Sequence, residues 1–131
     1  MRVLIYYEQQ GYGGVDTHLA HLVNNWPIKK DKLFIISNPN NKGLDYFRSL
    51  LSNPNVIIHT IKGVFNEPAV SSSKFMRLFI LLRNNFRFPG IFHDLLKELN
   101  PDIMLSNNGG YPGGLTNWTA AIVGKKYFKF S

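Results

Sequence analysis

Two glycine-rich stretches are the parts of this sequence whose backbone could bind a ligand. The first is Gln10-Gly11-Tyr12-Gly13-Gly14, and the second, residues 107–114, reads Asn-Asn-Gly-Gly-Tyr-Pro-Gly-Gly. Glycine lets a backbone approach a ligand closely, and the free N–H groups at the start of a helix attract anions. The chemistry that both stretches favour is therefore the binding of phosphate or another anion. The alternative is that these glycines only make turns.

The spacing of the first stretch excludes two common phosphate-binding motifs. Gly11, Gly13 and Gly14 do not form G-x-G-x-x-G, and no acidic residue follows the second predicted strand to hold a ribose. Both facts argue against a nicotinamide dinucleotide site. No Gly-Lys-Ser/Thr follows either, so the stretch is not a P-loop.

The apolar pattern predicts strands and helices that alternate along the whole chain. Strands are predicted at residues 3–7, 32–37, 56–61, 103–105 and 126–130. Helices are predicted at residues 15–26, 44–51, 74–86, 91–99 and 115–123, with a loop at 63–73. Such alternation predicts an α/β fold with a doubly wound, Rossmann-like parallel sheet. In that topology the two glycine stretches follow the first and fourth strands, and they meet where open α/β sheets bind ligands.

Length and composition limit the class of protein further. The chain has 131 residues, no cysteine, 44% hydrophobic residues and a formal net charge of +7. We expect one domain over residues 1–131, and the absence of cysteine excludes a disulfide framework, a thiolate zinc site and a cysteine nucleophile. No signal peptide and no apolar run long enough to cross a bilayer is visible. The positive charge suggests an anionic partner.

The segment from Lys74 to Phe88, read as a helix, has two different faces. One face, which we assign to the core, carries five apolar residues: Phe75, Leu78, Phe79, Leu82 and Phe86. The opposite face mixes basic and apolar residues (Met76, Ile80, Arg83 and Arg87), and we expect it to face an anionic membrane. The alternative is a solvated helix whose arginine stems cover apolar surface.

His18 and His21 lack the further ligands that a metal needs, so no metal site is predicted.

Three segments together resemble the glycosyltransferase family 4 enzymes. Gly13-Gly14-Val15-Asp16-Thr17-His18-Leu19 is similar to the opening of that family, in which Gly-Gly, a small apolar residue and an acid precede an apolar-patterned helix. Leu99-Asn100-Pro101-Asp102-Ile103-Met104 is similar to the segment that leads into the family's fourth strand. The second glycine stretch looks like a variant found in some bacterial members. The resemblance covers essentially the whole chain, at the level of an N-terminal domain.

The resemblance implies a two-domain GT-B architecture and a retaining, metal-free transfer of sugar from a nucleotide-diphosphate donor to a saccharide or lipid-linked acceptor. It implies that Gly13 and Gly14 face the donor phosphates. It implies an acceptor site at Asn107, Asn108, Gly109, Gly110 and Tyr111. The family often has a histidine after the fourth strand, but Ser106-Asn107-Asn108 stands there, so no catalytic residue is assigned.

Further expectations concern partners and location. In the family a C-terminal domain with an E-x7-E motif holds most of the nucleotide. We expect that domain to be missing here and residues 1–131 alone to be inactive. No cofactor is expected besides the donor substrate. We expect the protein to be cytoplasmic, peripheral at the inner membrane face, and without a nucleic-acid partner, because its positive residues are scattered and no such motif is present.

A second hypothesis remains open beside the transferase. The chain could be a stand-alone, flavodoxin-like module that binds a nucleotide or a phosphate. A flavodoxin is usually acidic, with a Ser/Thr-rich phosphate loop after the first strand, whereas this chain is basic and has Glu8-Gln9-Gln10-Gly11-Tyr12 there.

Overall fold

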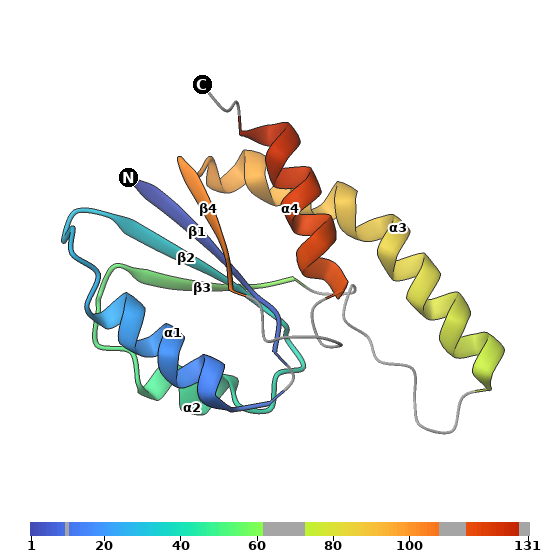
Figure 1. The fold of residues 1–131 in the computed structure, drawn as a ribbon, viewed down its shortest axis with the longest axis horizontal. Helices are drawn as coiled ribbons and strands as arrows, with labels where there is room; N and C mark the ends of the chain where they lie inside the picture. The colour runs from blue at the N-terminus through green and yellow to red at the C-terminus, as the bar shows by residue number, and fades with distance from the viewer. Residues whose placement is uncertain (10, 62–72, 108–114, 129–131) are drawn as a thin grey trace.

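The fold is a four-stranded parallel sheet with helices on both faces, seen in a computed structural model that describes residues 1–9, 11–61, 73–107 and 115–128. The strands are β1 (Arg2–Tyr7), β2 (Lys32–Ser37), β3 (Val56–Thr60) and β4 (Ile103–Asn107), in the order β3-β2-β1-β4. The helices are α1 (Gly14–Asn24), α2 (Leu44–Ser49), α3 (Lys74–Leu99) and α4 (Leu115–Tyr127) (Figure 1). The predicted doubly wound, Rossmann-like α/β fold is confirmed.

The central strand β1 explains why the sheet needs helices on both faces. Its apolar run is buried at every position from Val3 to Tyr7, as expected for a parallel strand that is covered on each side. Val3, Ile5 and Tyr7 pack with residues of α1 and α2. Leu4 and Tyr6 point to the other face, where they pack with residues of α3 and α4. Successive side chains of one strand therefore contribute to two separate cores.

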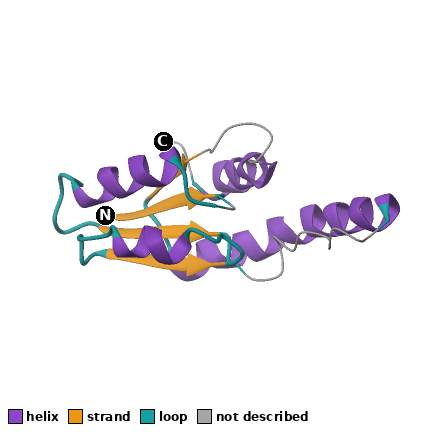
Figure 2. Cartoon of the chain, turned by 90° about the horizontal axis from the view of Figure 1, so that it is seen from below, coloured by secondary structure: helices purple, strands orange, loops and turns teal. Residues whose placement is uncertain are grey.

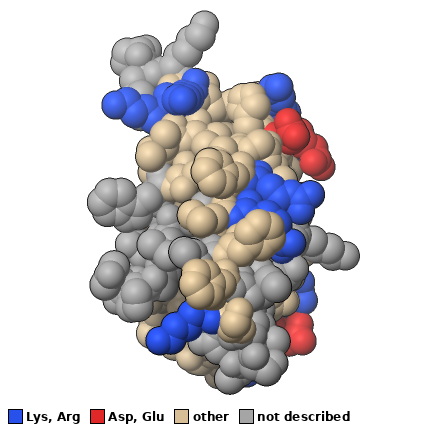
Figure 3. All heavy atoms as spheres, turned by 90° about the vertical axis from the view of Figure 1, so that its right-hand side faces the viewer, with Lys and Arg blue, Asp and Glu red and all other residues tan. Residues whose placement is uncertain are grey.

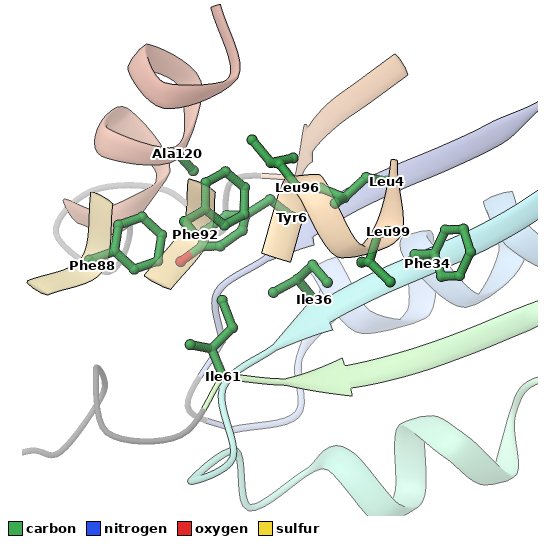
Figure 4. Packing of buried hydrophobic residues seen from close by; sticks show 10 residues of the cluster. All are labelled: Leu4, Tyr6, Phe34, Ile36, Ile61, Phe88, Phe92, Leu96, Leu99 and Ala120. Carbon is green, nitrogen blue, oxygen red and sulfur yellow. The ribbon is translucent and has the colours of Figure 1, made fainter. Parts of the chain in front are cut away.

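The core beneath α3 and α4 is aromatic (Figure 4). The ring of Tyr6 makes edge-to-face contacts with Phe88 and Phe92, with ring centroids 5.8 and 5.4 Å apart. Phe88 and Phe92 stack on one another at 5.3 Å. These contacts fix the C-terminal half of α3 to the end of β1, and Ala120 brings α4 into the same cluster.

Helix α3 differs from the prediction of two helices separated at Pro89-Gly90. It is one helix of 26 residues that contains Pro89. A proline in a helix interior removes one hydrogen bond and usually breaks or kinks the helix. Here Phe88 and Phe92, on either side of the proline, are both fully buried in one cluster, and their packing stabilises the continuous helix.

The assignment of the phenylalanine face of α3 to the core is wrong. Phe75 is 87% exposed and Phe86 is 83% exposed, and Phe79 and Leu82 are also exposed. The orientation of the helix is set by its C-terminal half, where Phe88, Phe92, Leu96 and Leu99 are buried. The N-terminal half continues past the sheet, as Figures 1 and 2 show, and its apolar residues with described side chains are exposed. The side chain of Leu78 is outside the described part of the chain.

The fifth strand predicted at residues 126–130 is not found over the described residues 126–128. Lys126 and Tyr127 belong to α4, and the N–H of Phe128 still donates to the carbonyl of Gly124 at 2.8 Å. Tyr127 and Phe128 pack against the aromatic core from the helix, which explains why an apolar, strand-like sequence stays helical. The predicted loop at 63–73 lies outside the described residues except for Ser73.

Candidate ligand site at the carboxyl ends of β1 and β4

The topology places two helix starts beside one another in the fold. β1 and β4 pair in parallel, and their registers end with Tyr7 opposite Asn107. α1 follows β1, and α4 follows β4 (Figure 1). The direction in which strands are added to the sheet reverses at β1, because β2 lies on one side of β1 and β4 on the other. This is the switch point at which open α/β sheets bind ligands.

The start of α1 presents backbone donors. Gly13 is the N-cap, with extended backbone (φ −164°), and its carbonyl accepts from the N–H groups of Asp16 and Thr17. The N–H of Gly13 itself donates to Oδ2 of Asp16 at 2.7 Å. Among the described residues, the N–H groups of Gly14 and Val15 have no acceptor. Such unpaired donors at a helix N-terminus attract an anion.

The glycines at this helix start are not explained by packing. A Cβ atom added to Gly14 would meet no described atom within 4 Å, and one added to Gly13 would meet, of the described atoms, Oδ2 of Asp16 at 3.9 Å. Gly43 is the opposite case, because a Cβ atom there would lie 2.6 Å from the backbone nitrogen of Tyr12. Gly43 is therefore needed by the fold, whereas the space beside Gly13 and Gly14 is open.

Asp16 is the acidic group of this site. It is fully buried, and its Oδ1 atom has no hydrogen-bond partner in the described part of the chain. Burial raises the pKa of Asp16, and the hydrogen bond from Gly13 acts in the opposite direction. The Asp16 carboxyl group therefore accepts from the N–H of Gly13, and the N–H groups of Gly14 and Val15 stay without an acceptor among the described residues.

At the start of α4, a carboxylate of the chain itself accepts from one backbone donor, the N–H of Thr116. Oε2 of Glu8, directly after β1, accepts hydrogen bonds from the backbone N–H of Thr116 at 3.2 Å and from its Oγ1 at 2.5 Å. Oγ1 of Thr116 also lies 2.5 Å from the Tyr6 hydroxyl. Because the Thr116 hydroxyl has one hydrogen and gives it to Glu8, the Tyr6 hydroxyl must be the donor to Thr116. Burial raises the pKa of Tyr6, which keeps this donor protonated.

The predicted acceptor residues fall mostly outside the described part. Asn107 is the last residue of β4, and its Nδ2 atom is buried without a partner among the described residues. An amide nitrogen in that position can donate to a hydroxyl of a ligand. Asn108, Gly109, Gly110 and Tyr111 lie outside the described residues, so their assignment stays a prediction.

The other predicted site residues do not gather here. Arg83 and Arg87 are exposed on α3, and the side chains of Met76 and Ile80 are outside the described part. His18 and His21 are exposed on α1. In the described ranges, no three histidine, aspartate or glutamate side chains come together in a way that could hold a metal ion. No helix in those ranges is both long and apolar enough to cross a membrane.

The sequence did not reveal two features of the site. The hydrogen-bonded set of Tyr6, Glu8 and Thr116 joins residues that are more than 100 positions apart, so it can be found only once β1 and β4 are known to be neighbours. Tyr12 and Tyr46 form an exposed edge-to-face pair with ring centroids 4.6 Å apart. Tyr12 lies inside the first glycine stretch, which was a signal for it, but nothing pointed to Tyr46.

The fold and this site define a class, a Rossmann-like doubly wound domain with an open helix N-terminus at its switch point. Comparisons of the chain with protein-family profiles, with curated proteins and with solved structures give no match.

Proposed function

We propose that this chain is the N-terminal, acceptor-side domain of a retaining glycosyltransferase with the two-domain GT-B architecture. It would help to move a sugar from a nucleotide-diphosphate donor to a saccharide or lipid-linked acceptor. The observation that supports this function most is the start of α1, where the N–H groups of Gly14 and Val15 have no acceptor in the described residues and no described atom lies within 4 Å of a Cβ added at Gly14. The resemblance of residues 13–19 to glycosyltransferase family 4 is the reason for assigning this anion site to the donor phosphates.

The chemistry of such a domain is electrostatic. When the glycosidic bond to the donor breaks, negative charge accumulates on the leaving diphosphate, and helix N–H groups that already point at it stabilise the transition state. Gly14 and Val15 would supply these donors, and Asn107 would donate to a hydroxyl of the acceptor. No metal or cofactor is part of the proposal. A second domain would hold the nucleotide and supply the acidic residues.

The first test is a comparison of ligands by calorimetry. Uridine diphosphate should bind residues 1–131 weakly, in the millimolar range that corresponds to about −4 kcal/mol, and flavin mononucleotide should not bind. Tight flavin binding would replace this proposal with the flavodoxin-like module, which the open start of α1 would serve equally well. Neither ligand binding would reject both.

The second test concerns the complete enzyme. The coding sequence that follows Ser131 should encode another α/β domain with an E-x7-E motif, and the combined protein should transfer sugar. Residues 1–131 alone should not turn over a nucleotide sugar. Turnover by this chain alone, or a longer coding sequence without such a domain, would contradict the proposal.

The proposal includes a location at the cytoplasmic face of the inner membrane. A lipid-linked acceptor is held at that surface, and the net charge of +7 suits the anionic lipids found there. Attachment would be peripheral.

A further inference from the structure

The N-terminal half of α3 carries a stripe of exposed apolar side chains. Phe75, Phe79, Leu82 and Phe86 follow one another at spacings of four, three and four residues, so they lie along one side of the helix. We call these four residues the phenylalanine stripe. All four are exposed, and the two outer phenylalanines are the most exposed large apolar residues in the described chain. Contiguous apolar surface of this kind marks an interaction site.

The stripe lies on the part of the molecule that projects. With 26 residues, α3 is roughly 39 Å long, and among its described side chains the first buried one is Phe88. Figure 2 shows the long helix reaching well beyond the sheet and the other helices. The stripe can therefore meet a broad surface without obstruction from the rest of the described domain.

Basic residues flank the stripe, and acidic residues are missing from it. Arg83 and Arg87 each come one residue after a stripe residue, so both lie on the same flank, about 100° around the helix, and both are exposed. Lys74 is exposed at the start of the helix. The sequence from Lys74 to His93 contains no aspartate or glutamate. Figure 3 shows this end of the molecule, where uncharged side chains lie among Lys and Arg side chains and the few acidic ones lie near one edge.

This combination of charges selects the occupant of the surface. A symmetric pair of chains through the stripe would bring charged residues of one sign only, the basic ones, from residues 74–93 of each copy, and no acidic residue of that segment to neutralise Arg83 and Arg87. An anionic lipid surface offers both complements at once, because phosphate groups attract the arginines and the acyl boundary accepts phenylalanine rings. Arginine and lysine beside exposed aromatic rings are what an interfacial helix presents to a membrane.

We infer that the N-terminal half of α3 is a membrane-docking helix, which inserts the phenylalanine stripe into the headgroup boundary of an anionic bilayer while Arg83 and Arg87 bind lipid phosphates. The inserted face is thus the one that the sequence assigned to the core. This inference rests on the proposed membrane location and does not depend on sugar transfer.

Co-sedimentation of the whole chain with lipid vesicles tests the inference. The chain should bind vesicles of phosphatidylcholine with 30% phosphatidylglycerol (about one lipid in three, enough for a clearly negative surface) and should not bind pure phosphatidylcholine. Phe75→Ser with Phe86→Ser should weaken binding about ten-fold or more, because two apolar rings no longer insert. Arg83→Glu with Arg87→Glu should weaken it at least about ten-fold, and the remaining binding should depend less on salt.

Two pairs of matched variants outside α3 serve as controls. One pair lies in the segment between α1 and β2, at the other end of the molecule from the start of α3 (Figure 1), and the other combines a residue of that segment with Ile57 of β3. Lys29→Glu with Lys30→Glu changes the net charge by the same amount at exposed positions. Ile28→Ser with Ile57→Ser removes two exposed apolar side chains. Both pairs should retain vesicle binding within about two-fold. Circular dichroism should show that all four variants keep the helical content of the parent chain, since every altered side chain is exposed.

Each remaining outcome decides against the inference. If the parent chain binds anionic vesicles but the stripe variants behave like their controls, the membrane location stands and the docking helix is wrong. If the parent chain binds no vesicles, both are wrong, while the transferase proposal keeps its separate calorimetric test. Two results would assign the stripe to another partner, provided that the parent chain binds no vesicles. One is a dimer in light scattering that the phenylalanine variants no longer form. The other is salt-sensitive binding to a single-stranded oligonucleotide that the same variants lose.

Discussion

The starts of α1 and α4 lie at the same switch point and differ in how their backbone donors are used. At α4, Glu8 reaches across from β1 and accepts from both the N–H and the hydroxyl of Thr116. At α1, Asp16 takes only the N–H of Gly13, and the donors of Gly14 and Val15 have no acceptor among the described residues. The Glu8 carboxylate accepts from the start of α4 as an anionic ligand would accept from the start of α1. A glycine-rich stretch before a helix is therefore not enough to make an anion site.

The largest effect is expected at the closed helix start. Thr116→Val removes the hydroxyl that joins Tyr6 to Glu8, so the buried Tyr6 hydroxyl loses the acceptor that it has in Thr116, and Glu8 loses one of the two hydrogen bonds that it accepts from Thr116. Because unsatisfied polar groups retain their desolvation cost, we expect a loss of about 3 kcal/mol in the free energy of unfolding. Urea denaturation measures it, with Thr119→Val in the same helix as the control. A loss below about 0.5 kcal/mol would mean that α4 does not depend on this set of hydrogen bonds.

A second prediction compares a packed glycine with an open one. Gly43→Ala places a Cβ atom against the Tyr12 backbone and should lower the free energy of unfolding by about 1–3 kcal/mol. Gly14→Ala meets open space, and alanine favours the helix, so stability should stay the same or rise by up to about 1 kcal/mol. Thermal unfolding of both variants beside the parent chain measures this difference. Equal destabilisation by the two substitutions would remove the argument that Gly14 is free of packing demands.

A third prediction separates binding from stability at α1. Gly14→Val fills the open space beside the unpaired donors, so uridine diphosphate should bind about ten-fold more weakly, equivalent to about 1.4 kcal/mol. The unfolding midpoint should hardly change, since no described atom lies within 4 Å of the new Cβ. Calorimetry gives the affinity. Unchanged affinity in a folded variant would show that the diphosphate does not approach Gly14.

The smallest effect concerns Asp16 and pH. Burial raises the pKa of Asp16 above its ordinary value of 3.8, so the folded state holds this proton more tightly than the unfolded state. The Asp16 contribution therefore destabilises the fold progressively as pH rises from about 3.8. In Asp16→Asn that contribution is absent, and the variant should gain stability relative to the parent chain as the pH rises from 3.8 toward neutrality. Urea midpoints across this range should diverge; parallel curves would show that Asp16 titrates normally.

Most of the fold could be predicted because local patterns decide it. β2 was predicted to the residue, since the apolar run of residues 32–37 is buried almost throughout. The errors arose where a distant part of the chain decides. Phe75 and Phe86 have the spacing of a core face, but the orientation of α3 is set by Phe88 and the residues that follow it. The strand-like end of α4 stays helical because Tyr127 and Phe128 pack onto the aromatic core.

The candidate site was predicted in part for the same reason. Gly13 and Gly14 are a local signal, and the helix start that they predict is present. The closure of α4 by Glu8 depends on the pairing of β1 with β4, which no local pattern contains. Whether a glycine-rich stretch is open or closed therefore depends on its neighbours in space.

One measurement tests the central claim directly, namely that the start of α1 is the anion site and the start of α4 is not. Uridine diphosphate is titrated into the ¹⁵N-labelled chain while each backbone amide is followed by nuclear magnetic resonance. The amide signals of Gly14 and Val15 should shift progressively and saturate together, and that of Thr116 should stay in place because Glu8 already accepts from it. A shift at Thr116 without one at Gly14 and Val15, or no shift at any of the three at saturating nucleotide, would contradict the claim.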